Sequence, residues 1–206
     1  MQRRDFITRL GTVAATGLFA GWATSAEETC TPITPYVSRC QVGIPSNMIH
    51  VAALQQSSEW CWAACIEMVF TYYGHRVPQA RIVRETWGAV VNMPGQPEQI
   101  LADLNREWKD EKGKKFTVTG DALSANAANA VEDLRQDRPL ILGTLGHAVV
   151  LTALTTDVNQ GTRAWQVVAA TVRDPWPGRG KRILTPQEWY NINFAARISV
   201  EDSDEE

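Results

Sequence analysis

The chain has 206 residues, of which 44% are apolar and 21% are charged, a balance that suits one globular domain with a sizeable core. Its net charge is −3 and it has no long run of Lys or Arg, so we expect neither a nucleic-acid partner nor attraction to an anionic membrane.

Residues 1–26, MQRRDFITRLGTVAATGLFAGWATSA, combine a basic start, a short stretch rich in Ala, Gly and Thr, and a small residue at Ala26. This pattern is typical of a signal peptide and is too short and too weakly apolar for a stable membrane anchor. The arginines at positions 3 and 4, followed by Asp-Phe-Ile, resemble the twin-arginine export signal of bacteria, with an ordinary Sec signal as the alternative. We therefore expect a periplasmic or secreted protein, in an oxidising compartment where disulfides persist.

Residues 27–50 are rich in Pro, Thr and Ser and follow no sustained period, so we expect an extended N-terminal arm. From Trp62 to Phe70, apolar residues recur at spacings of three and four, which predicts a helix. Ser58 is the expected N-cap of this helix and Gly74 its end. Further helices are expected over 78–88, 97–108 and 126–136.

After Pro139 the pattern changes to β-branched and apolar runs that are separated by turn signals. These runs are LILGTL, HAVVLTAL, AWQVVAATV and FAARISV. Helices first and strands last predict an α+β domain over residues 51–200, with a helical half and an antiparallel sheet half. The stretch EDSDEE, 201–206, is expected to be a solvated acidic tail.

The segment QQSSEWCWAAC, residues 55–65, places two cysteines one helical turn apart. Cys61 falls in the first turn of the predicted helix, where unpaired N–H groups and the helix dipole favour a thiolate. Cys65 lies a turn further in, among apolar neighbours, and is expected to be a core residue. The four cysteines match no CxxC zinc pattern and the three histidines form no HxxxH pair, so we expect no metal and no cofactor.

A cysteine nucleophile needs a histidine that accepts the thiol proton and later donates one to the leaving group. His147, in LGHAVVL, opens an apolar strand, although composition alone favours a buried core histidine there. His50 and His75 are expected to be exposed and inert. Asp174, in VRDPWPG, ends the next long strand, and a hairpin return brings it beside the strand of His147. An Asp before Pro is, however, most often only a turn residue.

A tetrahedral oxyanion needs donors, and the candidates are the backbone N–H of Cys61 and the side-chain amide of Gln55. With these residues in order, the chain resembles the papain-like cysteine peptidases over residues 50–200. In that family a Gln precedes the nucleophile by six residues, as Gln55 precedes Cys61, and Trp-Ala follows it, as at Trp62. The family base lies in a His-Ala-Val stretch at a strand start, as His147 does.

The orienting Asn or Asp of the family matches Asp174, and the Trp two residues later, which shields its hydrogen bond, matches Trp176. The chain departs from papain itself in having Ser-Glu-Trp at 58–60 instead of Cys-Gly-Ser, an Asp as orienting residue, and a short interval from nucleophile to base. These features are similar to compact bacterial branches such as the double-glycine leader peptidases and the papain-like effector proteases. No propeptide-sized segment precedes the catalytic region, so zymogen control of the papain kind is not expected.

The resemblance implies a papain-like fold and an exported bacterial cysteine peptidase that hydrolyses peptide or isopeptide bonds in a peptide or protein substrate through a thioester acyl-enzyme. It assigns Cys61 as nucleophile, His147 as base and acid, Asp174 as orienting group and Gln55 as oxyanion donor. One alternative is acyl transfer to an amine, as in transglutaminase-like relatives. Another is a catalytically inactive papain-like binding module, which is disfavoured because all four residues are present.

Because the resemblance reserves Cys61 as a thiolate, three cysteines are available for a disulfide. Cys30 and Cys40 both lie in the loop-rich arm, and we expect them to pair with each other. The rival is a pairing of either one with Cys65, which would tie the arm to the helix.

Overall fold

The computed structural model describes residues 27–44, 48, 50–122 and 127–203. The expected signal peptide at 1–26 and the last residues, 204–206, lie outside the described residues. None of the helices in these described ranges has the length and apolar character needed to cross a membrane.

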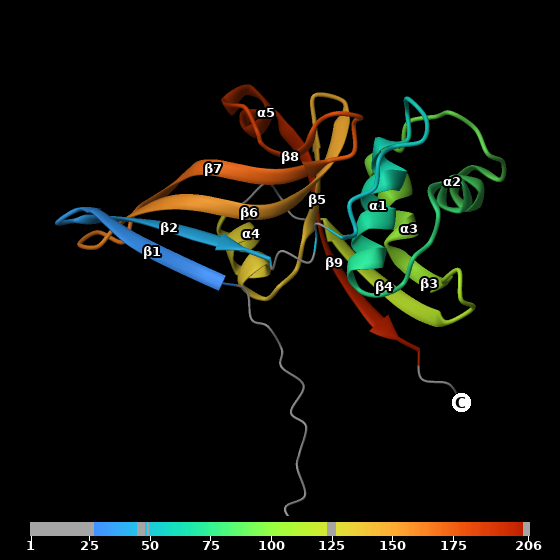
Figure 1. The fold of residues 1–206 in the computed structure, drawn as a ribbon, viewed down its shortest axis with the longest axis horizontal. Coiled ribbons are helices and arrows are strands. Elements are labelled where there is room, and N and C mark those ends of the chain that lie inside the picture. Colours follow the sequence, from blue (N-terminus) through green and yellow to red (C-terminus); the bar gives the residue numbers. More distant parts are fainter. Residues whose placement is uncertain (1–26, 45–47, 49, 123–126, 204–206) are drawn as a thin grey trace, which may run out of the picture.

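Helices and strands alternate irregularly along the described chain (Figure 1). The helices are α1 (Cys61–Tyr72), α2 (Gln79–Trp87), α3 (Pro97–Asp103), α4 (Ala127–Arg135) and α5 (Pro186–Tyr190). The strands are β1 (Glu27–Thr34), β2 (Val37–Gly43), β3 (Asn105–Lys109), β4 (Lys115–Ala122), β5 (Leu140–Thr144), β6 (His147–Asn159), β7 (Trp165–Asp174), β8 (Gly180–Ile183) and β9 (Ile192–Asp202).

The described strands form one antiparallel sheet in the order β1-β2-β6-β5-β9-β4-β3, with β7 also paired to β6 and β8 paired to β7. The first part of β6, 147–151, pairs with β5, and its remainder, 153–159, pairs with β2. In Figure 1, β1, β2, β6 and β7 project together to one side, while α1, α2 and α3 lie with β3 and β4 at the opposite end. The fold class is therefore α+β, as the sequence predicts, and α1 packs against β6 where the two parts meet.

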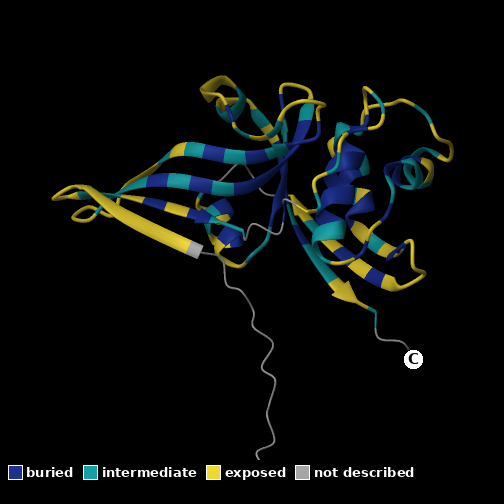
Figure 2. Cartoon of the chain, in the orientation of Figure 1, coloured by how far each residue is buried: buried dark blue, intermediate teal, exposed yellow. Residues whose placement is uncertain are grey.

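Helix α1 is buried on almost every side, because each residue from Trp62 to Phe70 is buried (Figure 2). Phe70 makes edge contacts with Trp108 of β3 and Phe116 of β4, at ring-centroid distances of 5.6 and 5.3 Å. A helix packed in this way cannot shift without disturbing many contacts. Its N-terminal residue, Cys61, is therefore held in a defined position.

The helix expected over 97–108 is correct only as far as Asp103, because α3 ends there and Trp108 lies in β3. The indole Nε1–H of Trp108 donates to the backbone oxygen of Asp103 at 2.7 Å, which fixes the chain where it leaves the helix. Trp108 then faces Phe116 across the β3–β4 register. In the connecting turn, two backbone N–H groups donate to Oδ1 of Asp110. The expected helix extended to Trp108 because Leu101, Leu104 and Trp108 recur at spacings of three and four.

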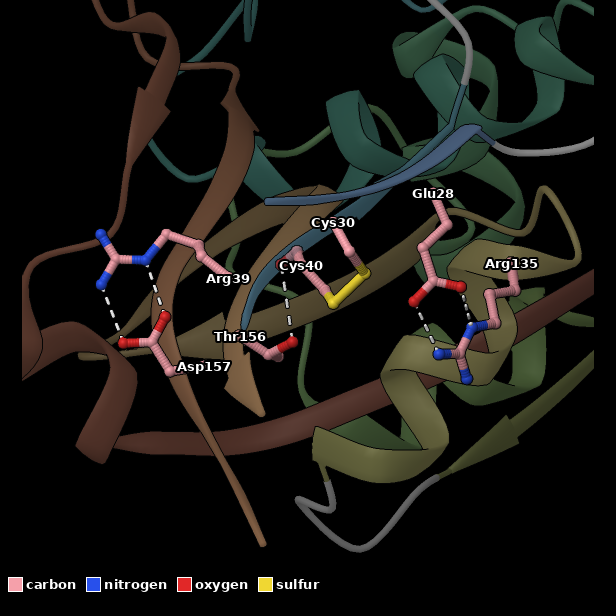
Figure 3. The surroundings of a disulfide bond; sticks show 7 residues. All are labelled: Glu28, Cys30, Arg39, Cys40, Arg135, Thr156 and Asp157. Atoms are coloured by element: carbon pink, nitrogen blue, oxygen red, sulfur yellow. Dashed lines mark hydrogen bonds and ion pairs between the residues drawn. A yellow bond between two sulfur atoms is a disulfide. The ribbon is translucent and has the colours of Figure 1, made fainter. Parts of the chain in front are cut away.

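The arm expected over 27–50 is a β-hairpin, because β1 pairs with β2 and β2 pairs with β6. The arm is therefore part of the sheet. Within residues 51–200, α1, α2 and α3 come first as expected, but β3 and β4 precede α4, and α5 lies between β8 and β9. Cys30 and Cys40 lie opposite each other in the β1–β2 register and form the expected disulfide (Figure 3). Arg135 of α4 donates two hydrogen bonds to the carboxylate of Glu28 in β1, at 2.8 and 3.0 Å. The hairpin is thus fixed to both the sheet and α4.

The acidic end is only in part a tail, because Glu201 and Asp202 belong to β9. Oδ1 of Asp202 lies 2.7 Å from Nε2 of His75. His75 is buried, contrary to expectation, and stacks on Phe116 with the ring centroids 4.4 Å apart. His50 is exposed, as expected.

Replacing both Cys30 and Cys40 with Ala should lower the free energy of unfolding by roughly 2–3 kcal/mol, because the disulfide closes a short loop that is otherwise free in the unfolded chain. Urea unfolding of the wild-type protein and the double variant without reductant measures this difference. Reductant should destabilise the wild-type protein and leave the double variant unchanged. Peptide mapping without reduction that finds Cys65 cross-linked would contradict the pairing.

Candidate active site

Helix α1 begins at Cys61, and its first turn has no side-chain cap. Ser58, the expected N-cap, instead accepts a hydrogen bond from Nδ2 of Asn92, and the backbone N–H of Glu59 donates to Oδ1 of the same Asn. The N-cap position therefore belongs to Trp60. The N–H groups of the first turn have no partner within the helix, so they favour a negative charge at Cys61.

Cys65 lies one turn further along α1 and is fully buried. Burial, with smaller contributions from Cys61 and Asp174, raises the pKa of its thiol well above the ordinary value. Cys65 therefore stays protonated at neutral pH, in keeping with a core residue. Cys61, by contrast, is a free thiol that is partly exposed and lines the cleft described below.

His147 opens β6 and follows a tight turn in which Leu145 and Gly146 have positive φ angles of 49° and 75°. Its Nε2 lies 2.7 Å from Oδ1 of Asp174, and the ring lines the same cleft as Cys61. Since Asp174 occupies Nε2, Nδ1 is the nitrogen left for the sulfur. Burial alone would lower the pKa of His147, but the interactions with Asp174 and Cys61 outweigh it and raise this pKa to about 9. The ring is therefore an imidazolium at neutral pH.

Asp174 ends β7, and its side chain is fully buried. Oδ1 also accepts the backbone N–H of Trp176 at 2.9 Å, while Oδ2 accepts Nε–H of Arg182 at 2.8 Å. Burial would raise the pKa of this carboxyl, but the donors from His147, Trp176 and Arg182 hold it well below its usual range. The Trp176 indole meets the His147 ring edge-on, with the centroids 6.1 Å apart. Asp174 is thus an ionised acceptor, shielded from water and directed at His147.

The backbone of Gln55 lies close to Asp174, because its N–H donates to the carbonyl oxygen of the following residue, Pro175, at 2.9 Å. Its side chain points elsewhere, since Nε2 donates to the backbone oxygens of Ser57 and Ser58 at 3.0 and 2.9 Å. Oε1 is buried and has no hydrogen-bond partner among the described residues. Both amide protons are used in this conformation, so the predicted oxyanion role requires the amide to rotate toward Cys61.

The sequence analysis missed Gln79, the first residue of α2, which is fully buried. Its Oε1 accepts the backbone N–H of Gln56 at 3.0 Å. Its Nε2 donates to the backbone oxygen of Leu54 at 2.9 Å and to Oε2 of Glu67 at 2.8 Å. Glu67 lies in the middle of α1, so Gln79 fastens the segment around Gln55 to the helix that carries Cys61. No sequence signal marks such a Gln, because its partners lie on other elements.

An open cleft of about 620 Å³ runs past Cys61 and His147. One side is the loop around Gly95, which packs so closely on Trp62 that a Cβ atom on Gly95 would lie 2.5 Å from the indole. The other side includes the β5–β6 turn and Phe194 of β9. A substrate bound in this cleft would lie directly against the sulfur and the imidazole.

Glu28, Cys30 and Cys40 lie close enough together to share an ion. Both sulfurs are bonded to each other, however, so this cluster offers one carboxylate and no thiolate to a metal.

A search of the curated proteins finds no match to the chain. Among solved structures, the chain is similar to the peptidase domain of Streptococcus ComA, a bifunctional ABC transporter of a quorum-sensing pathway. The TM-score is 0.51 and the identity 15%, over 73% of this chain and 97% of that one. A second structure, UfSP from C. elegans, has a TM-score of 0.47 and 14% identity over 85% of this chain and 36% of that one. At such identity, the likeness to the ComA domain shows a shared fold alone.

The family model described as papain-like cysteine protease AvrRpt2 matches residues 42–194, well over half of the chain. The matched region includes Cys61, His147 and Asp174. The chain therefore belongs to this family of papain-like cysteine proteases.

Proposed function

We propose that this chain is an exported bacterial cysteine peptidase that hydrolyses peptide or isopeptide bonds, with Cys61 as nucleophile, His147 as acid and base, and Asp174 as orienting group. The observation that carries the proposal is that Cys61, at the start of α1, lines one open cleft with His147, whose Nε2 lies 2.7 Å from Oδ1 of Asp174. Membership of the papain-like family supports the peptidase chemistry.

In the first half of the reaction, the Cys61 thiolate attacks the carbonyl carbon of the scissile bond, and the carbonyl oxygen becomes an oxyanion. His147, as imidazolium, donates its proton to the leaving nitrogen, the C–N bond breaks and the amine departs. The acyl group then remains on Cys61 as a thioester. Asp174 keeps the ring in place and stabilises its positive charge throughout.

In the second half, the neutral His147 takes a proton from a water molecule, whose oxygen attacks the thioester carbon. The second tetrahedral intermediate collapses, the C–S bond breaks, and Cys61 leaves as a thiolate. The products are a carboxylic acid and the starting thiolate–imidazolium pair. An amine in place of the water would give acyl transfer instead of hydrolysis.

The oxyanion is proposed to accept the backbone N–H of Cys61 and one amide N–H of Gln55. The Gln55 amide oxygen is buried without a partner among the described residues, so this arrangement forgoes a hydrogen bond. An oxyanion beside Cys61 offers the amide nitrogen a stronger, charged acceptor than the two carbonyl oxygens.

Gln55→Ala should lower kcat by about 10²–10³, whereas Gln56→Ala should leave it near the wild-type value, since only Gln55 stands six residues before Cys61. Steady-state kinetics on a peptide substrate measures both variants. Urea unfolding serves as the control, because the Gln55 amide also binds two backbone oxygens. If kcat falls in Gln56→Ala and stays near the wild-type value in Gln55→Ala, the assignment of Gln55 is wrong.

Cys61→Ala should abolish cleavage, whereas Cys65→Ala should mainly lower stability, because it leaves a small cavity in the core. His147→Ala should remove most activity, and Asp174→Ala should remove less, because Asp174 only orients the ring and stabilises its charge.

Turnover should also fall as the pH rises through about 9, where His147 loses the proton that the leaving nitrogen needs.

Mass spectrometry of a peptide library, with and without an added amine, tests these expectations and separates hydrolysis from acyl transfer. Substantial cleavage by Cys61→Ala would rule out the mechanism. Products that carry the added amine, with little free acid, would favour acyl transfer over hydrolysis.

The mature protein is proposed to leave the cytoplasm by the twin-arginine route, on the strength of the pattern in residues 1–26. The Cys30–Cys40 disulfide fits an oxidising compartment. Replacing Arg3 and Arg4 with Lys should leave the precursor in the cytoplasm of a bacterial host, whereas the unchanged protein should be exported and cleaved after Ala26. Cell fractionation and N-terminal sequencing measure both. Undiminished export of the Lys variant would favour the Sec route.

A further inference from the structure

An aspartate in the orienting position creates a charge problem that a neutral asparagine does not. The thiolate proposed for Cys61 and the carboxylate of Asp174 would place two negative charges around the single positive charge of His147. The Asp174 side chain is 0% exposed, so water cannot balance its charge. A second cation is therefore needed on the side of Asp174 that faces away from His147.

Arg182 of β8 supplies that cation. Its Nε–H donates to Oδ2 of Asp174 at 2.8 Å, and its side chain is only 19% exposed. Arg179 lies at 3.5 Å from the same oxygen but is 52% exposed, so water screens its charge much more. Arg182 is thus the principal cationic partner of the buried carboxylate.

The Arg182 side chain is itself held from behind. Its Nη1 and Nη2 donate to the two carboxylate oxygens of Glu188 in α5, at 2.8 and 2.6 Å. Glu188 also accepts the backbone N–H and the hydroxyl of Thr185, in the capping box that starts α5. Arg182 is therefore clamped between two carboxylates and cannot swing away from Asp174 without losing both.

We propose that Arg182 is a positioning residue of the triad, which holds Oδ2 of Asp174 so that Oδ1 faces His147, and which balances the carboxylate charge so that the imidazolium can still give up its proton. This role rests on the proposed function, because it concerns the same three residues. With Arg182 beside it, the Asp174 carboxylate can orient His147 without an unbalanced charge, as the neutral Asn does in relatives that carry one.

The charged groups facing His147 are Cys61 from α1 and Asp174 from β7, with Arg179, Arg182 and Glu188 around the carboxylate. Removing the Arg182 charge leaves the carboxylate unbalanced, so the pKa of His147 should rise. Removing the Asp174 charge should lower it. A substitution that merely loosens β8 or α5 would weaken the contact between His147 and Asp174, so it would also lower the pKa of His147.

The experiment is an NMR pH titration of the His147 Cε1 proton in the full mature chain, with Arg182→Met, Arg182→Gln, Arg182→Lys and Asp174→Asn. Both neutral Arg182 variants should raise the midpoint by roughly one pH unit, and Arg182→Lys should stay near the wild-type value. Asp174→Asn should lower the midpoint. Arg39→Met is the matched control and should change nothing. Arg39 donates two hydrogen bonds to Asp157 (Figure 3), which lies near the end of β6 opposite to His147.

The second arm is turnover in a double-variant cycle. Arg182→Met should lower kcat roughly 10- to 100-fold in the wild-type background and have little further effect beside Asp174→Asn, where no carboxylate needs balancing. A midpoint that falls or stays constant in the neutral variants, or an equal loss of kcat in both backgrounds, would overturn the role of Arg182. If the wild-type protein shows no turnover, the proposed function fails, while the titration still decides whether Arg182 balances Asp174. If Arg182→Met does not fold, Arg182→Gln carries the same test.

Discussion

The hydrogen bond between Nε2 of His147 and Oδ1 of Asp174, 2.7 Å long, is the contact on which the rest of the site depends. It requires the start of β6 to lie beside the end of β7, and the antiparallel register that pairs Val150 with Arg173 provides this. Strand β8 then brings Arg182 to the same carboxylate. A register slip of one residue would turn these side chains to opposite faces of the sheet, so the pairing of β6 and β7 is as important to the site as its chemistry.

Alternating charges stabilise this line of groups, in which Asp174 is buried and the others are partly buried. The thiolate proposed for Cys61, the imidazolium of His147, the carboxylate of Asp174, the guanidinium of Arg182 and the carboxylate of Glu188 follow one another with opposite signs. Each charge alone would be costly to bury, whereas each one here touches a partner of opposite sign. Helix α1 adds to this order at one end, because its uncapped N-terminus favours the negative sulfur.

The sequence predicted Cys61, His147 and Asp174 because their order, spacing and neighbours resemble those of papain-like peptidases. Their local signals, a helix start, a strand start and a strand end, also fit core and turn residues. The α+β class followed from the strand-rich C-terminal part. Arg182 and Gln79 could not be predicted, because their roles come from contacts that exist only once β7, β8, α1 and α2 are packed. The β1–β2 hairpin was missed because β1 is an edge strand exposed along its described length and therefore shows no apolar alternation (Figure 2). Strand β3 was missed because the spacing of Leu101, Leu104 and Trp108 also fits a helix.

The proposed thiolate–imidazolium pair is tested most directly by the rates at which iodoacetamide alkylates the two free cysteines near neutral pH, in the wild-type protein and in His147→Ala. We expect fast alkylation of Cys61 and slow alkylation of Cys65, because Cys65 is buried and the pKa of its thiol is raised by that burial. In His147→Ala the rate at Cys61 should fall, because the positive charge beside the sulfur is lost. An unchanged rate at Cys61 in that variant, or preferential alkylation of Cys65 in the wild-type protein, would contradict the pair.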